Sequence, residues 1–217
     1  MVNRGSVFAF GDLKTLDGQQ MGTGSIDVSF YGHFDEDFTK TCGFDVTDPE
    51  AVKKHLRELL HDWSPELRAF FESIEGPVVW RNLYMLPVGF RWEHKRGITL
   101  LGDAAHVMTP FGGIGVNSAL HDALLLSRAI IKYVETGNAG DLDSRIADYE
   151  EEMFRVTKKG ALLTEGCMND MLFTPGAPRA RIGNYVTRHA AANFSDWMHP
   201  VIAAVVHTVY FFYKLVY

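Results

Sequence analysis

The feature that most constrains this chain is a glycine-rich turn that joins an apolar run to a helical pattern. Residues 97–101, Gly-Ile-Thr-Leu-Leu, have the composition of a short buried strand, and the pair Gly102-Asp103 ends it. Glycines at 112, 113 and 115 follow, before a helical pattern from about Asn117 to Val134. Glycines let the main chain approach a ligand closely, and a helix start directs free N–H groups and a positive dipole end at it. The segment therefore predicts a site for a ligand with hydroxyl groups and an electron-rich ring edge.

This segment carries a family resemblance. Residues 102–117, followed by Asp122-Ala123, resemble the second flavin-binding motif of the aromatic-hydroxylase type of FAD-dependent monooxygenases. Four further matches support the resemblance: Leu86-Pro87, Trp92, residues 97–101 and Tyr149-Glu150. The alternating residues 26–30 and the helical pattern around Asp62-Trp63 are similar to the substrate domain of the tetracycline-inactivating branch. The resemblance covers roughly residues 5 to 170.

The resemblance implies a set of cofactor contacts. Asp103 would bind the ribityl hydroxyls of FAD, and Pro110 would lie near the flavin ring on the side where oxygen reacts. The pyrimidine edge would meet the backbone N–H groups of Gly113, Ile114, Gly115, Val116 and Asn117. Asn117 would also use its side-chain amide. No catalytic side chain is implied by the motif.

The resemblance also implies an activity. Family members reduce FAD with NAD(P)H and use O2 to hydroxylate an aromatic or polyketide-like small molecule, here in secondary metabolism. The cofactor carries such chemistry while the protein positions it and excludes water. We therefore expect FAD as cofactor, NAD(P)H as reductant and a small-molecule substrate.

The wider pattern predicts an α/β fold with a partial substrate-domain sheet, the C-terminal part of a flavin-binding domain, and C-terminal helices. Strands are expected at residues 6–10, 25–31, 78–84 and 97–101, with Asp17-Gly18 as a hairpin turn. A helix is expected after Thr47, whose hydroxyl can cap it, another after Ser64, and a further one from Asp141 to about Thr164. We predict three parts: a partial substrate sheet (1–88), a flavin-binding segment (89–172) and a tail (173–217).

A Gly-x-Gly-x-x-Gly turn, which would hold the FAD pyrophosphate, is not found in this sequence. We therefore expect the resemblance to begin partway through the family's fold, without the N-terminal half. Binding of FAD by this chain alone is then in question, and a separate N-terminal half or a homo-oligomer is an open alternative. Two other functions also stay open: a flavin-free descendant acting as an isomerase or cyclase on a natural product, and a non-catalytic remnant.

The composition narrows the remaining classes. A net charge of −6 without a Lys/Arg block argues against nucleic-acid binding, and two cysteines cannot build a disulfide scaffold. The N-terminus has no signal-peptide pattern, so a cytoplasmic location is expected. Residues 201–217 are almost wholly apolar, which leaves two alternatives: a buried or interface helix, or a membrane-associated tail. The short length and the internal His207 favour the first.

Overall fold

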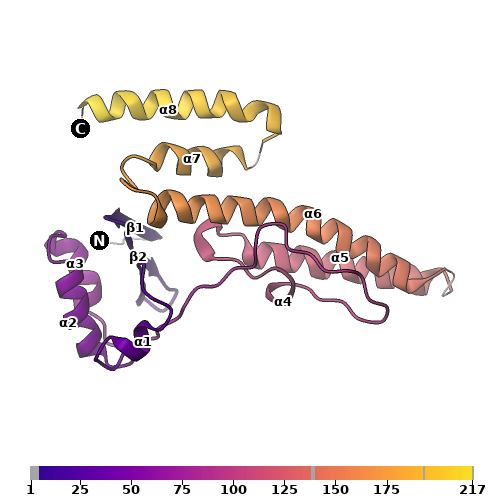
Figure 1. Ribbon diagram of the computed structural model, residues 1–217, viewed down its shortest axis with the longest axis horizontal. Coiled ribbons are helices and arrows are strands. Elements are labelled where there is room, and N and C mark those ends of the chain that lie inside the picture. Colours follow the sequence, from indigo (N-terminus) through magenta and orange to yellow (C-terminus); the bar gives the residue numbers. More distant parts are fainter. Residues whose placement is uncertain (1–4, 138–139, 193, 217) are drawn as a thin grey trace. The chain divides into compact units, whose positions relative to one another are not determined.

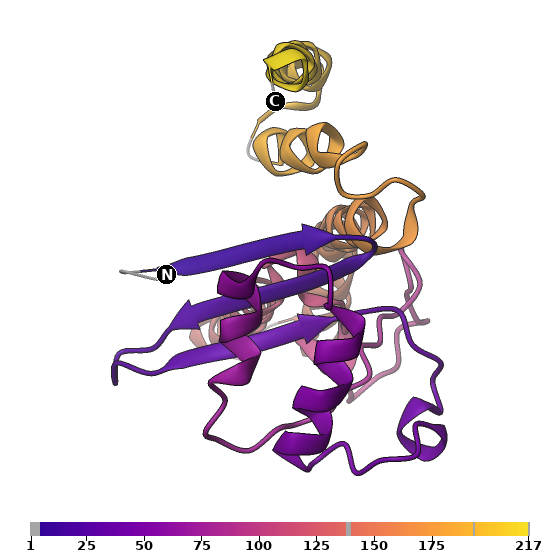
Figure 2. The ribbon, with the colours of Figure 1, turned by 90° about the vertical axis from the view of Figure 1, so that its left-hand side faces the viewer.

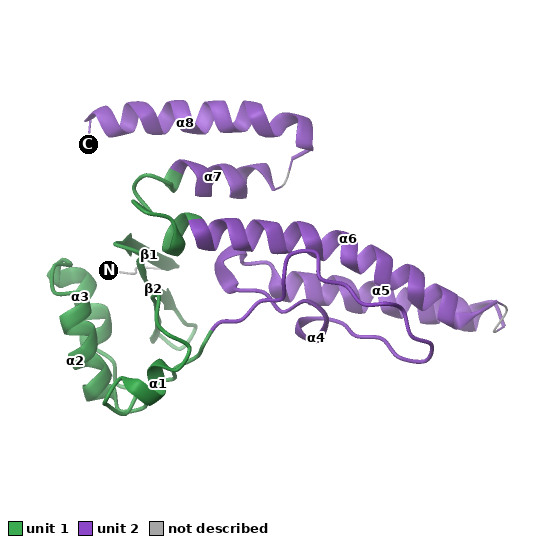
Figure 3. Ribbon diagram, viewed as in Figure 1, with its two compact units in different colours: residues 1–82, 170–182 green, residues 83–169, 183–217 purple. Residues whose placement is uncertain are grey.

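A computed structural model describes residues 5–137, 140–192 and 194–216. The chain forms two compact units (Figure 3), one of residues 1–82 and 170–182, the other of residues 83–169 and 183–217. Figure 1 labels their helices and strands. The three-part division expected from the sequence stays a prediction.

The first unit contains an antiparallel sheet with the strand order β1-β2-β3 (Figure 2). The strands are β1 (Ser6–Gly11), β2 (Lys14–Gln20) and β3 (Ile26–Tyr31), so the strands expected near 6–10 and 25–31 are confirmed. Leu16 of β2 is paired with Phe30 of β3 and is 1% exposed.

The predicted turn at Asp17-Gly18 is wrong, because both residues lie inside β2. The turn lies at Asp12 and Leu13, whose φ angles of 46° and 59° are unusual for residues other than glycine. Gly18 serves packing instead. A Cβ at Gly18 would lie 2.6 Å from a ring carbon of Phe70, so the missing side chain makes room for that ring.

Helices α2 (Pro49–Leu59) and α3 (Pro65–Glu72) cover one face of this sheet, as Figure 2 shows, and a short α1 (Phe38–Thr41) precedes them. Their core is Leu56, Leu60 and Phe71, with Phe30 of the sheet packed against it. The start of α3 after Ser64 is confirmed, and Ser64 caps this helix by accepting a hydrogen bond from the Leu67 N–H. The cap of α2 is Asp48 rather than Thr47, because the Thr47 hydroxyl is bound to Asp45.

The second unit is built on two long helices, α5 (Gly115–Glu135) and α6 (Leu142–Met168), which pack side by side (Figure 1). A short α4 (Asp103–His106) precedes α5, with a 3-10 turn, η1 (Pro110–Gly112), between them. The core here is Ala105, Tyr149 and Met153. After a π-helical turn, η2 (Asn169–Phe173), come α7 (Ile182–Ala191), the 3-10 turn η3 (Asp196–Met198) and α8 (His199–Val216).

The strands predicted at 78–84 and 97–101 are wrong, since neither stretch pairs with another strand among the described residues. A strand needs a neighbouring backbone for its N–H and C=O groups, and within those residues the three paired strands are β1 to β3. Side chains hold these stretches instead. In the first, Trp80 stacks on Phe38 with ring centroids 4.7 Å apart.

The predicted fold class, helices combined with a small partial sheet, is confirmed. The C-terminal pattern is a helix, α8, and with η3 it gives one stretch, Asp196–Val216, long and apolar enough to cross a membrane. None of that stretch is buried, so the alternative of a buried helix is not what the structure shows.

Candidate cofactor site

The site begins at Gly102, which turns the chain from residues 97–101 into α4. Its φ of 60° and ψ of −144° lie in a region that favours glycine, and a Cβ there would lie 3.3 Å from the Cβ of Ala119. The Gly102 N–H donates to Oδ2 of Asp122 at 3.0 Å. This geometry places Asp103 at the start of α4 with its carboxylate exposed.

A buried pair fixes α4 to α5. Nε2 of His106 lies 2.5 Å from Oδ2 of Asp122, and the two side chains are 9% and 1% exposed. One carboxylate thus accepts from both the Gly102 backbone and the His106 ring, at the two ends of α4. The pair sets where Asp103 projects.

The loop before α5 is fixed to α6 by Thr164, a residue to which the sequence pattern gave no role. The Thr164 hydroxyl accepts from the Gly112 N–H at 2.9 Å and donates to the Thr109 carbonyl at 2.6 Å. A Cβ at Gly112 would lie 3.1 Å from the Cβ of Thr164, so this glycine is needed for close approach. No spacing signal in the sequence connects a threonine inside a helix to a loop more than fifty residues earlier.

The seven residues expected to contact a flavin lie along this turn and the first turn of α5. Asp103, Pro110, Gly113, Val116 and Asn117 are exposed, and Ile114 and Gly115 are half-buried. The Ile114 side chain packs against Gly160 of α6, where an added Cβ would lie 2.6 Å from Cδ1 of Ile114. Ile114 therefore has only its backbone to offer to a ligand.

Gly115 is different from the other glycines of the loop. It begins α5 with an ordinary φ, and a Cβ there would have no heavy atom within 4 Å. The described part of the chain therefore gives neither a backbone nor a packing reason for glycine at this position. A ligand that comes close to the main chain is a reason.

The start of α5 presents unsatisfied donors. No side chain among the residues that the structure describes caps it, and the first helical hydrogen bond runs from the Ser118 N–H to the Ile114 carbonyl. The N–H groups of Gly115, Val116 and Asn117 consequently have no acceptor within the helix. With the positive end of the dipole of a 21-residue helix, they favour an electron-rich or anionic group.

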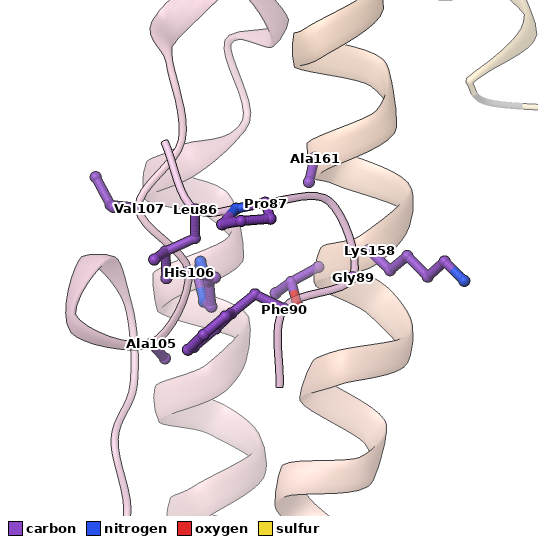
Figure 4. A pocket seen from close by; sticks show the side chains of 10 residues that line it. Leu86, Pro87, Gly89, Phe90, Ala105, His106, Val107, Lys158 and Ala161 are labelled. Carbon is purple, nitrogen blue, oxygen red and sulfur yellow. The ribbon is translucent and has the colours of Figure 1, made fainter. Parts of the chain in front are cut away.

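A small cleft lies beside this turn (Figure 4). Leu86, Phe90, His106 and Lys158 are among its lining residues, and its volume is about 20 Å³, which is room for about one water molecule. Drug-sized ligands occupy pockets of roughly 300–1,000 Å³, so the cleft does not enclose a flavin. None of the seven expected contacts lines it.

Comparison with known proteins decides the family. Residues 28–161 match the family described as FAD binding domain, which is more than half of the chain. The chain belongs to the FAD binding domain family. All seven expected contact residues fall inside the matched stretch, and helices α7 and α8 lie outside it.

Several curated proteins are similar to this member of the family. It is 33% identical over 134 residues to monooxygenase penA of Penicillium thymicola, covering 54% of this chain and 31% of that protein. It is 45% identical over 91 residues to monooxygenase asqM of Emericella nidulans, covering 36% of this chain and 20% of that protein. It is 36% identical over 94 residues to salicylate hydroxylase of Pseudomonas putida, covering 43% of this chain and 21% of that protein.

The chain therefore spans less than a third of the length of these relatives. The resemblance to FAD-dependent monooxygenases that the turn indicated is confirmed, and FAD is the cofactor of the family.

The Tyr149-Glu150 pair of the motif holds residues 92–101 of this FAD binding domain against α6. The Glu150 carboxylate, 2% exposed, accepts from Thr99 at 2.7 Å and is hydrogen-bonded to Nδ1 of His94 at 2.7 Å. The Tyr149 hydroxyl donates to the Leu100 carbonyl at 2.9 Å. These bonds replace strand pairing in positioning the run that leads to Gly102.

His94 links two carboxylates in this network. Its Nε2 lies 3.2 Å from Asp143, which also accepts from the Gly97 N–H at 3.0 Å. The hydrogen bonds to Glu150 and then to Asp143 raise the pKa of His94 above its ordinary value. Protonated His94 is therefore favoured in the folded state.

A metal centre has no support within the described residues, where no group of three His, Cys, Asp or Glu side chains is arranged to hold an ion. Neither Cys42 nor Cys167, both among the described residues, is in a disulfide, and the Cys167 sulfur lies 3.5 Å from Nε2 of His189.

Proposed function

We propose that this chain supplies part of the flavin site of an FAD-dependent monooxygenase, which uses NAD(P)H and O2 to hydroxylate an aromatic or polyketide-like small molecule. The observation that carries the proposal is the uncapped start of α5 beside an open Gly115. It is the arrangement that a close, electron-rich ring edge requires. We place the activity in secondary metabolism and in the cytoplasm.

Each expected contact has a physical role in this proposal. The Asp103 carboxylate accepts hydrogen bonds from ribityl hydroxyls, since it is exposed and needs polar partners. The Gly113 N–H donates to the Pro110 carbonyl at 2.9 Å, so Gly113 contributes close approach of its main chain, while the N–H groups from Ile114 to Asn117 donate to the oxygen and nitrogen atoms of the pyrimidine edge. The positive end of α5 stabilises negative charge at that edge, and Pro110 lies along the ring. Bound FAD supplies the activation of oxygen.

The names of the relatives support the reaction class. Monooxygenase penA and monooxygenase asqM are named for oxygen transfer, and salicylate hydroxylase and hispidin-3-hydroxylase of Neonothopanus nambi are named as hydroxylases. The last is 33% identical over 119 residues, which is 55% of this chain.

The test is a flavin titration of the purified chain, read as quenching of flavin fluorescence, with FAD, FMN and riboflavin compared. The proposed contacts touch only the ring and the ribityl chain, so all three flavins should bind with similar affinity. Asp103→Asn should lower the affinity for each flavin by about tenfold, because a hydrogen bond to a charged group contributes about 1.5–3 kcal/mol. Asp148→Asn, an exposed position on α6, is the matched control and should bind as the unaltered chain does.

Two results would reject the proposal. One is equal binding by Asp103→Asn and Asp148→Asn. The other is colourless protein that converts a substrate without NAD(P)H or O2, which would favour a flavin-free isomerase or cyclase.

A further inference from the structure

Helix α8 presents an apolar face that the described part of the chain leaves open. Val201, Val205, Val209, Phe212 and Val216 recur every three or four residues along it and so share one side. Their side chains are between 57% and 74% exposed. A continuous exposed apolar face marks a contact with a partner or a membrane.

The other side of α8 carries His207, Tyr210 and Lys214, which are three and four residues apart and share a face. Thr208 borders the apolar side, and its hydroxyl donates to the Ala204 carbonyl at 2.7 Å. The side that carries His207 is directed toward α7, because Nδ1 and Cε1 of His207 lie 3.1 Å from where a Gly183 Cβ would be. The apolar side is therefore the one directed away from α7.

Aromatic side chains stand at both ends of α8. Trp197, in the turn η3 just before the helix, is 75% exposed. Phe211, Phe212 and Tyr213, near its end, are 56% to 61% exposed. Large aromatic rings of this kind favour the boundary between lipid headgroups and acyl chains.

The charge of the C-terminal helices also favours a lipid surface as the partner of α8. Within the second unit, residues 183–216 contain two basic side chains, Arg188 and Lys214, and one acidic side chain, Asp196, all of them exposed. In a chain whose net charge is −6, this stretch is net positive, which suits a surface of anionic lipid headgroups.

We propose that α8 lies in the plane of a membrane that contains anionic lipids. Its apolar face, from Val201 to Val216, enters the acyl boundary, while the face with His207 and Lys214 stays on the polar side with α7. The stretch is long and apolar enough to cross, but an in-plane position keeps the face with His207 and Lys214 out of the hydrocarbon, which a crossing would not. The matched FAD binding domain stretch ends at residue 161, so this inference is independent of flavin binding.

The first test is co-sedimentation of the full chain with vesicles of phosphatidylcholine and phosphatidylserine. Val205→Glu with Val209→Glu should lower the affinity at least about tenfold, since two charges enter the apolar face. The matched control is Ile131→Glu with Val134→Glu on α5, which also places two glutamates on exposed aliphatic positions, 52% and 61% exposed. It should bind within about twofold of the unaltered chain, and far-UV circular dichroism should show both variants equally helical.

The second test measures depth and tells an in-plane helix from one that crosses. In a Val205→Trp variant, fluorescence quenching relative to the parent should be strongest with lipids brominated near the headgroup. Strongest quenching with bromines at the chain ends would overturn the in-plane position. Failure to bind the anionic vesicles would overturn the membrane partner, as would a dimer through this face that persists with vesicles present.

Discussion

Two adjoining stretches of the second unit, residues 97–101 and residues 102–117, reach order by different means. The sequence presents them as one strand-turn-helix, yet the turn forms with close contacts while the run before it pairs with no described strand. The turn has its anchors nearby in space, since Asp122 and Thr164 supply side-chain partners from α5 and α6. The run at 97–101 has no neighbouring strand among the described residues, and a strand requires one.

The run at 97–101 is nonetheless held at its polar atoms. Thr99 and Leu100 bind side chains of α6, while Ile98, Leu100 and Leu101 are 63%, 41% and 41% exposed. Hydrogen bonds to a helix can thus place an apolar segment without burying it. Hydrogen bonds to α6 therefore fix the position of the run at 97–101, although they do not bury its apolar side chains.

The largest expected effect comes from removing the anchor of the turn. Asp122→Ala leaves the Gly102 N–H and the buried His106 ring without their acceptor. Leaving two buried donors unpaired should cost about 2–6 kcal/mol of the free energy of unfolding, about 1–3 kcal/mol for each, measured by urea denaturation. Asp148→Ala, at an exposed position, should cost less than about 0.5 kcal/mol. Equal losses in the two variants would show that the turn does not depend on this pair.

A smaller effect concerns the network that holds the run at 97–101. The pKa of His94 is raised in the folded state, so its contribution to stability is present below its ordinary pKa and is lost as pH rises through the folded-state value. The melting temperature should fall from about pH 6 to about pH 9 by more in the unaltered chain than in His94→Gln. His61→Gln, at an exposed position, is the control and should keep the slope of the unaltered chain. The same slope in His94→Gln would remove His94 from the account.

The smallest effect is expected within the run itself. Ile98→Thr keeps a β-branched side chain at a position that is 63% exposed, so the free energy of unfolding should change by less than about 0.5 kcal/mol. Met153→Ala, in the adjoining core at 1% exposed, should cost about 2–5 kcal/mol in the same urea experiment. A large loss for Ile98→Thr would mean that the run is buried in solution.

The sequence predicts the parts of this fold whose causes are local. Periodicity predicts β3, α5 and α6, and Ser64 before Pro65 predicts the start of α3. The hairpin turn was misplaced because Gly18 is required by the ring of Phe70, a contact distant in sequence. The strands predicted at 78–84 and 97–101 do not form, because an apolar sequence pattern does not show whether a neighbouring strand is present to pair with.

In the candidate site, too, the features with local causes are predicted from the sequence, and those that depend on distant contacts are not. The glycine turn, Asp103 and the start of α5 follow from residue types and spacing. Thr164 could not be predicted, since its role depends on packing between a loop and a helix. Ile114 was expected at the ligand through its backbone, and the structure adds that its side chain packs on α6 at Gly160.

The most direct test of the flavin site is Gly115→Ala, with flavin affinity and the free energy of unfolding measured on the same sample. The new methyl group meets no atom of the described residues within 4 Å at an ordinary helical φ, so the free energy of unfolding should stay the same or rise by up to about 1 kcal/mol. Gly22→Ala, which is similarly unobstructed in the first unit, is the control and should bind FAD as the unaltered chain does. We predict that Gly115→Ala loses FAD affinity by at least about tenfold while remaining folded. Unchanged FAD affinity in a folded Gly115→Ala chain would contradict a flavin at the start of α5.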